Sequence, residues 1–158
     1  MALLVGRHVN KIDRKGRVSV PKLFRDAFKG QSFSGLYAYP LFKSPAIEAC
    51  GEDFMARLSD SLDDLDMFSD EQDDLASVIL ENAHPLAFDP EGRVVLPPEL
   101  LAHANITTQA LFVGRGGRMQ IWEPDAYAKH STNAFARARS RGATLRLRPN
   151  EPPTNTEG

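Results

Sequence analysis

Asp13-Arg14-Lys15-Gly16-Arg17-Val18-Ser19-Val20-Pro21 occurs in this chain together with a second, closely related stretch. That second copy is Asp89-Pro90-Glu91-Gly92-Arg93-Val94-Val95-Leu96-Pro97, 76 positions further along. Both follow the pattern Asp-x-x-Gly-Arg-Val-x-apolar-Pro. The repetition of this phrase indicates that the chain contains two copies of one structural unit.

The first half of the phrase predicts a tight hairpin turn. Asp13 and Asp89 begin it, where a carboxylate can accept hydrogen bonds from backbone N–H groups two or three residues on. Gly16 and Gly92 supply the positive φ that a hairpin loop usually requires. We therefore expect these four residues to shape two equivalent turns.

The second half of the phrase predicts a strand that leads into a helix. Arg17 and Arg93 leave the turn, which places each guanidinium near a hairpin tip. Alternating apolar residues then form one buried strand face: Val18 and Val20 in the first copy, Val94 and Leu96 in the second. The closing proline suits the first turn of a helix. The predicted unit is therefore turn, strand and helix, present twice.

The repeat continues more loosely beyond the phrase. Residues 36–40 resemble residues 119–123, now 83 positions apart, so we expect about seven extra residues in the second copy. An added strand at 110–113 and a hairpin turn at 114–117 would account for them. The glycines of that turn lack the Lys-Ser/Thr of a phosphate-binding loop.

Composition bounds the class of protein. The 158 residues, 42% hydrophobic and 25% charged, suit one soluble domain or two small halves that share a core. The single Cys50 excludes an internal disulfide and favours a cytoplasmic location, and we expect this residue to be a small buried hydrophobe. No apolar run reaches the length of about 18 residues that spans a membrane, so we expect no membrane partner.

Charge is strongly segregated along the chain. Residues 1–45 carry nine Lys/Arg and two Asp/Glu, whereas residues 46–83 carry one and twelve. Four cations, Lys11, Arg14, Lys15 and Arg17, lie within seven positions at the first hairpin. Such a cluster on a projecting element can neutralise phosphates, although a simply solvated hairpin tip is the alternative. The recurrence of Gly-Arg in the second copy favours a binding role.

The acidic connector at residues 41–84 reads as helical. Ser44-Pro45 is a good helix start, and Ile47, Cys50, Phe54 and Leu58 would then form one helical stripe. Ser69 and Gln72 have the spacing of a capping box, which predicts a second helix. The twelve carboxylates follow no metal-ligand spacing, so we interpret them as a solvated face placed opposite the basic hairpin.

The remaining sequence proposes no catalytic or metal-binding residues. The four histidines are scattered, and no nucleophile elbow, zinc motif or dinucleotide loop is present. We therefore expect no enzyme, no cofactor and no small-molecule substrate. Trp122 ends a strand as a core or interface residue, Glu123-Pro124 begins a last helix with a basic end, and residues 149–158 are expected to be disordered.

The two phrases, with residues 110–114 and 119–124, resemble the MraZ family of bacterial transcriptional regulators over roughly residues 3–130. The resemblance implies an α+β fold: two pseudo-symmetric swapped-hairpin AbrB-like repeats that form one β-barrel-like core with outer helices. The expected divisions are a first repeat at 5–52, an acidic helical connector at 53–82, a second repeat at 83–126, and a C-terminal helix and tail at 127–158.

The resemblance also implies a function. Family members form ring-shaped homo-oligomers, bind repeated boxes in the promoter of the division and cell-wall gene cluster, and associate with the nucleoid in the cytoplasm. The family's Asp-x-x-x-Arg motif, implicated in DNA binding, matches Asp13 with Arg17 and Asp89 with Arg93.

We expect double-stranded promoter DNA to be the partner. Arg17 suits a base edge, Lys15, Arg14 and Lys11 suit phosphates, and Arg93 has less electrostatic help because its turn contains Pro90 and Glu91. An antitoxin-like protein-interaction module on the same fold is the alternative function, and an enzyme on a related double-psi barrel is a third.

Overall fold

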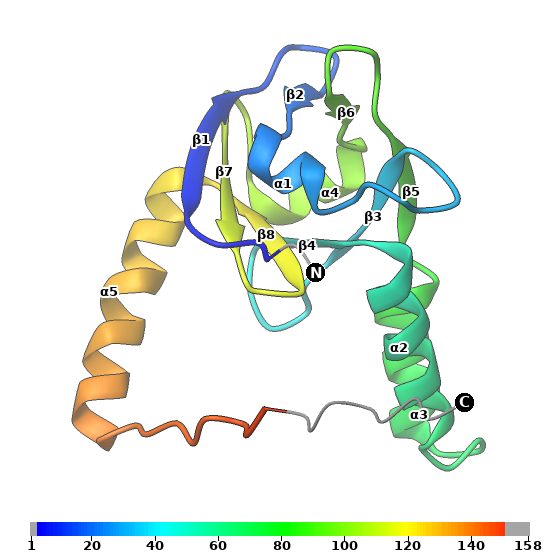
Figure 1. Cartoon of the computed structure of the whole chain (residues 1–158), viewed down its shortest axis with the longest axis vertical. Coiled ribbons are helices and arrows are strands. Elements are labelled where there is room, and N and C mark those ends of the chain that lie inside the picture. The colour runs from blue at the N-terminus through cyan, green and yellow to red at the C-terminus, as the bar shows by residue number, and fades with distance from the viewer. Residues whose placement is uncertain (1–2, 151–158) are drawn as a thin grey trace, which may run out of the picture.

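The computed structural model describes residues 3–150. It has an α+β fold in which strands from both halves of the chain form one large sheet and one ribbon (Figure 1). The strands are β1 (Arg7–Lys11), β2 (Arg17–Ser19), β3 (Gly35–Pro40), β4 (Ile47–Cys50), β5 (His84–Ala87), β6 (Arg93–Val95), β7 (Gln109–Gly114) and β8 (Arg118–Trp122). The helices are α1 (Lys22–Asp26), α2 (Glu52–Asp63), α3 (Asp70–Leu75), the π-helical turn η1 (Ala76–Leu80), α4 (Pro98–Ala104) and α5 (Pro124–Arg141).

The strands of the two copies pair with each other, while the first copy also keeps one isolated bridge, between Ile12 and Val18, to the segment before it. In the antiparallel ribbon β2–β6, Val18 lies opposite Val94 and Ser19 lies opposite Arg93. Each half thus lends its second hairpin strand to the other half, which is the swapped-hairpin arrangement that the resemblance implied. Both prolines that close the phrase stand at the N-cap of the following helix, Pro21 before α1 and Pro97 before α4.

The large sheet repeats the same symmetry. Its antiparallel strand order is β1-β7-β8-β4-β3-β5, so each half contributes three strands in mirrored order. The sheet remains open, with β1 and β5 at its edges, but these two strands lead through the turns into β2 and β6. The ribbon therefore covers the open side, and sheet and ribbon together enclose a barrel-like core (Figure 1).

This strand order corrects the expected alignment of the looser repeat. The partner of β5 is β3 and the partner of β1 is β7, so residues 35–40 are equivalent to residues 109–114 and not to residues 119–123. The strand expected as an addition at 110–113 belongs to the repeat itself. The expectation failed because β3 and β8 are both short apolar strands with aromatic residues, and local similarity cannot tell which strand of a hairpin is equivalent.

The core lies between the large sheet on one side and the ribbon with α1 and α4 on the other. All four alternating residues of the phrase are buried: Val18, Val20, Val94 and Leu96 are no more than 1% exposed. Phe24 and Leu100 bring α1 and α4 into the same cluster, which meets Phe112 and Ile121 of the sheet. A second cluster on the outer face of the sheet contains Trp122 and Tyr127, where the first turns of α5 pack.

The helix expected to start at Ser44-Pro45 does not exist. Ile47 and Cys50 belong to β4, a central strand whose four residues are all buried, and helix α2 begins only at Glu52. Because β4 is covered on both faces, its sequence lacks the polar alternation that marks a strand. The spacing of its apolar residues therefore continued by chance into the stripe of α2.

One half of the expected capping box is present, since the Ser69 side chain accepts a hydrogen bond from the Gln72 N–H at 3.1 Å, whereas the Ser69 N–H donates to the Asp66 carbonyl at 3.0 Å. Glu123 caps α5 in a similar way, through bonds from the Asp125 and Ala126 N–H groups. Figure 1 shows α2 with α3 descending from one side of the sheet and α5 from the other, away from the hairpin tips.

Irregular segments flank the folded elements at both ends of the described chain. The first strand begins at Arg7, preceded by a single bridge between Leu4 and Gly116. Residues 143–150 have no regular structure and are exposed, and the rest of the expected disordered tail lies outside the described residues. Within residues 3–150, no helix combines the length and apolar character needed to cross a membrane.

Candidate nucleic-acid interface

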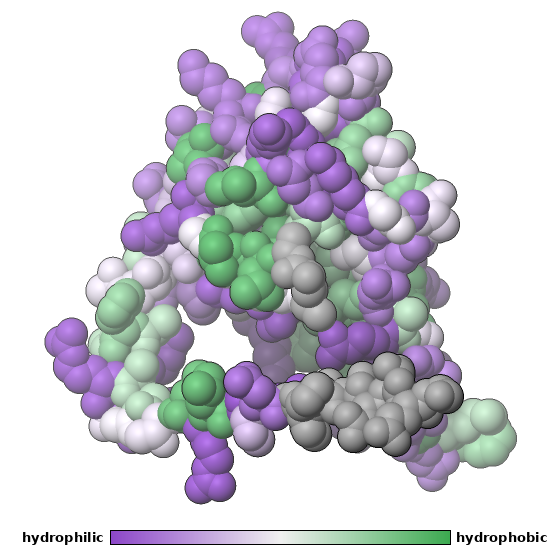
Figure 2. Space-filling view, in the orientation of Figure 1, coloured by the Kyte–Doolittle hydropathy of each residue, from purple (hydrophilic) through white to green (hydrophobic). Residues whose placement is uncertain are grey.

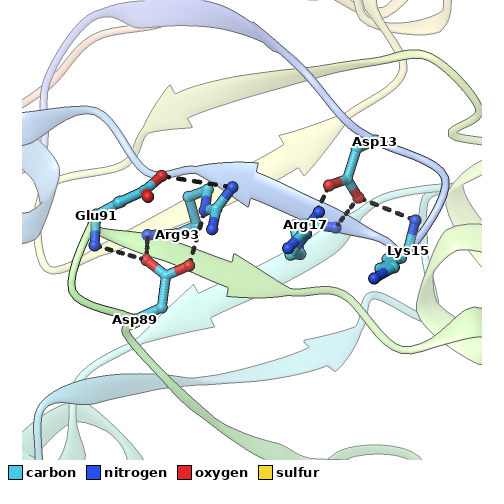
Figure 3. Close-up of polar contacts among 6 residues, drawn as sticks. All are labelled: Asp13, Lys15, Arg17, Asp89, Glu91 and Arg93. Atoms are coloured by element: carbon cyan, nitrogen blue, oxygen red, sulfur yellow. Dashed lines mark hydrogen bonds and ion pairs between the residues drawn. The ribbon is translucent and has the colours of Figure 1, made fainter.

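Each copy of the phrase forms the same turn, and an aspartate holds it together (Figure 3). In the first turn, Asp13 Oδ1 accepts hydrogen bonds from the backbone N–H groups of Lys15 and Arg17, both at 2.9 Å. Asp13 Oδ2 accepts a third from Arg17 Nε at 2.6 Å. The carboxylate therefore fixes both the turn and the direction in which the arginine leaves it.

The second turn repeats this geometry. Asp89 Oδ1 accepts from the N–H groups of Glu91 at 2.9 Å and Arg93 at 2.8 Å, and Asp89 Oδ2 accepts from Arg93 Nε at 2.7 Å (Figure 3). The glycines adopt positive φ values, +82° at Gly16 and +77° at Gly92. A Cβ on Gly16 would also lie 2.8 Å from the carbonyl oxygen of Leu96, so this turn packs closely on the other half of the chain.

The hydrogen bonds change the acidity of both aspartates. The pKa of Asp13 lies below its usual value, mainly because the Arg17 N–H donates to the charged carboxylate. The pKa of Asp89 is lowered by the equivalent bond from the Arg93 N–H. The bond from the Arg93 side chain to Asp89 in turn raises the pKa of Arg93. Both turns therefore depend on ionised aspartates.

The ribbon presents its arginines on one outward face. Side chains alternate across a strand, and Val18 and Val94 point into the core, so their neighbours point outward. Arg17 of one half and Arg93 of the other lie diagonally on this face; Val95 is directly opposite Arg17, and Ser19 is directly opposite Arg93. Two guanidinium groups from distant parts of the chain are thus brought onto one short, exposed surface.

The two arginines are not equally available. The Arg17 side chain is 37% exposed, and the pairing with Asp13 uses Nε. Among the described residues, no hydrogen bond or ion pair engages its terminal nitrogens. Arg93 is 28% exposed and has a second carboxylate nearby, because Glu91 Oε2 lies 3.5 Å from Arg93 Nη1. Arg17 therefore has the greater freedom to bind an anion or a base edge.

The remaining predicted cations surround the first turn only. Arg14 and Lys15 occupy the turn and Lys11 ends β1, and all three side chains are exposed. The corresponding positions of the second turn hold no cation. The interface is therefore symmetric in its backbone and asymmetric in its charge.

The sequence did not identify Ser19, Val95 or Arg25 as residues of this region. Ser19 and Val95 join the outward face only through the pairing of β2 with β6, which no local pattern reveals. Arg25 of α1 donates from Nη1 to the Val20 carbonyl at 2.8 Å, and its guanidinium lies against Gly92. The sequence shows that Arg25 follows Pro21 by four positions, but it does not show that Arg25 contacts the second turn.

Other polar side chains lie apart from this face. Glu48, in the centre of the sheet, accepts hydrogen bonds from the Tyr39 hydroxyl and from Arg118 Nε and is only 6% exposed. Cys50 is fully buried beside it, and burial raises the pKa of its thiol to about 12. Cys50 is therefore a buried core residue, as the sequence predicted.

The ring of His8 packs edge-on against that of Phe24, with ring centroids 5.4 Å apart. Among residues 3–150, no group of three or more His, Cys, Asp or Glu side chains is arranged to hold a metal ion.

Known proteins resemble this chain over most of its length. A family model described as "MraZ protein, putative antitoxin-like" matches residues 79–147. Proteins named "Transcriptional regulator MraZ" are similar to it: that of Pelagibacter ubique is 42% identical over 91% of this chain and 93% of its own. That of Parvibaculum lavamentivorans is 47% identical over 84% and 83%, and that of Gluconacetobacter diazotrophicus 43% over 92% of each. With a doubled, interlocked Asp-x-x-Gly-Arg turn and relatives of this similarity, the chain belongs to the MraZ family.

Proposed function

We propose that this protein is a transcriptional regulator that binds double-stranded promoter DNA through the β2–β6 ribbon and its turns. The observation that carries the proposal is the outward face on which Arg17 and Arg93 are aimed by aspartates and take no part in the core. The names of the relatives, which are transcriptional regulators, support the same function.

The residues divide between reading bases and holding phosphates. Arg17 projects from a rigid turn with its terminal nitrogens available, and a guanidinium of this kind can donate two hydrogen bonds to guanine in the major groove. Lys11, Arg14 and Lys15 are exposed beside it and suit phosphates on either side. Arg93 is also paired with Glu91, so its contribution to DNA binding is smaller.

One hairpin offers few contacts and would bind weakly on its own. A ring-shaped homo-oligomer that presents several identical hairpins to repeated promoter boxes gains affinity, because each further contact becomes intramolecular. The proposed target is the promoter of the division and cell-wall gene cluster that includes the protein's own gene. DNA binding of this kind implies a nucleoid-associated protein in the cytoplasm.

A band-shift assay with the DNA upstream of the protein's own gene tests the proposal. We expect a selective shift whose affinity falls steeply with salt, with a slope of about −0.9 per phosphate neutralised. The triple variant Lys11→Gln, Arg14→Gln and Lys15→Gln should flatten that slope, whereas the control Lys43→Gln, an exposed lysine outside the hairpin, should not. A wild-type affinity that ignores salt would contradict binding to the phosphate backbone.

An antitoxin-like module remains the second candidate, because the family model carries that description and residues 143–150 are exposed and without regular structure. A tail of this kind can fold against a protein partner. A small toxin gene beside this one, with a product that co-purifies with the chain and is released on removal of residues 143–158, would favour this function over DNA regulation.

A further inference from the structure

Two helical arms of opposite charge extend from the sheet. The acidic arm, residues 52–81, contains α2, α3 and η1 and carries eleven Asp or Glu against one Arg. The basic arm, residues 124–150, contains α5 and the exposed segment after it and carries six Lys or Arg against one Asp. Neither charge excess is neutralised within its own arm.

The helices of the two arms lie on opposite sides of the molecule. Figure 1 shows α2 and α3 below one edge of the sheet and α5 below the other, both directed away from the turns of the β2–β6 ribbon. The α5 helix is anchored at its start by Tyr127, which packs with Trp122 at a ring distance of 5.4 Å. Its distal part stands clear of the body in Figure 2. In Figure 1 the segment after α5 runs toward the side of α3, but among the described residues no ion pair joins the two arms.

Both arms also expose apolar side chains next to their charges. Phe68 and Met67, between α2 and α3, are 91% and 74% exposed. Phe135 of α5 is 71% exposed, and Leu145 and Leu147 alternate with arginines in the segment that follows. Figure 2 shows hydrophobic and hydrophilic surface alternating along the lower part of the basic arm. Apolar anchors flanked by charge are what a protein interface requires.

We propose that the basic arm of one chain docks on the acidic arm of a second copy of the same chain. The inference rests on the proposed self-association for its partner, and it assigns the two surfaces that make the contact. Because each chain has one arm of each kind, the contact is head-to-tail, and repeating it gives either a closed ring or an open filament.

The charges of the two arms favour a second copy of the chain over nucleic acid as their partner. The acidic arm would repel DNA, and only a partner with a basic surface fits it. The basic arm could attract DNA, but it points away from the ribbon and would have to bind a different duplex. A second copy supplies both complementary surfaces at once.

Charge reversal on each arm tests the contact. Variant A carries Arg137→Glu, Arg139→Glu and Arg141→Glu in the last turns of α5. Variant B carries Asp60→Lys, Asp63→Lys and Asp64→Lys at the end of α2, where added cations suit the helix C-terminus. We expect each variant alone to lose assembly, so that light scattering gives the single-chain mass of 17.5 kDa.

Mixing the two variants shows whether assembly was lost because the contact was broken or because the fold was damaged. An equimolar mixture of A and B restores opposite charges at every contact and should recover the assembly, as should one chain carrying all these changes. Lys22→Glu with Lys29→Glu and Lys43→Glu, exposed lysines on neither arm, is the matched control and should assemble like wild type. Raising the salt from about 0.05 to 1 M should dissociate the wild type, since exposed charges are screened within about 3 Å at 1 M.

Several results would overturn the arm contact. These are an assembly in A and B that equals the wild type, or a wild type that stays at 17.5 kDa at every concentration. A variant A that stays assembled but loses DNA would assign the basic arm to nucleic acid instead. The proposed DNA function fails separately, through Arg17 variants that still assemble and still bind the promoter.

Discussion

Val18 and Val94 lie directly opposite each other in the β2–β6 ribbon, and both occupy the sixth position of the duplicated phrase. A residue that pairs with its own counterpart lies on the axis that relates the two halves. Glu48 and Gln120 form the corresponding pair in the large sheet, where β4 meets β8. The chain is thus built like a dimer of two fused halves, and each arginine of the outward face sits opposite a strand of the other half.

Truncating the axial valines should destabilise the fold to a similar extent at either position. Both are 1% exposed, so Val18→Ala or Val94→Ala removes buried methyl groups and should cost about 1–3 kcal/mol. Because the two residues are in contact range across the ribbon, a double-mutant cycle should show coupling of about 0.5 kcal/mol or more. Urea unfolding measures both. Val95→Ala, at a position 52% exposed, is the control and should change stability by less than about 0.5 kcal/mol.

The loss of stability on replacing a turn glycine by alanine should depend on which atoms the added Cβ contacts. Gly16→Ala places that atom 2.8 Å from a backbone carbonyl, whereas Gly92→Ala meets the flexible guanidinium of Arg25. Gly116→Ala shares the positive φ, +83°, and meets nothing within 4 Å. Conformational strain alone costs about 1–2 kcal/mol, so thermal unfolding should place Gly16→Ala lowest and Gly116→Ala highest. Equal losses at all three positions would show that packing against Leu96 is unimportant.

Replacing Arg17 should remove selectivity without unfolding the protein. Its pairing with Asp13 is exposed and screened by solvent, so the pair contributes little to stability and Arg17→Ala should keep a near-native melting temperature. Loss of a bidentate base contact costs about 1–3 kcal/mol, which is roughly a 5- to 150-fold loss of affinity for the promoter boxes. Arg17→Lys keeps the charge but not the planar fork, and should retain only non-specific binding. A band shift of Arg17→Ala that matches wild type would remove this residue from the interface.

The turns should weaken in acid. Asp13 and Asp89 have folded-state pKa values below the ordinary value of 3.8 for an aspartate, so their stabilisation is fully present above that value. It is lost as the pH falls through the lower folded-state pKa. Asn in both positions keeps the neutral turn but loses the charged pairing. The melting temperature of wild type should therefore exceed that of the Asp13→Asn, Asp89→Asn variant at pH 7, and the difference should close in acid.

A difference that stays constant with pH would contradict this origin of turn stability. The exposed carboxylate Asp60 on α2 provides the control, because Asp60→Asn changes the same chemical group outside both turns. Its difference from wild type should not follow the profile of the double variant.

Much of the fold could be predicted where a residue and its partner are close in sequence. The Asp13 carboxylate bonds to groups two and four residues away, and Ser69 caps a helix through Gln72. The resemblance to the MraZ family extended this local reading to swapped hairpins. Prediction failed at β4, which is covered on both faces and carries no alternation, and in the equivalence of β3 with β7.

By itself, the sequence determined the two turns, the cationic character of one of them and the opposite charges of the two arms, because these properties need only neighbouring residues. The tertiary structure alone decided that Arg17 and Arg93 share a face, that Arg25 lies against the second turn, and that α5 lies on the opposite side of the sheet from α2 and α3. These relations join residues far apart in the chain, and burial of the apolar faces selects among the possible strand pairings. The conformational preferences of neighbouring residues do not indicate which strands will pair.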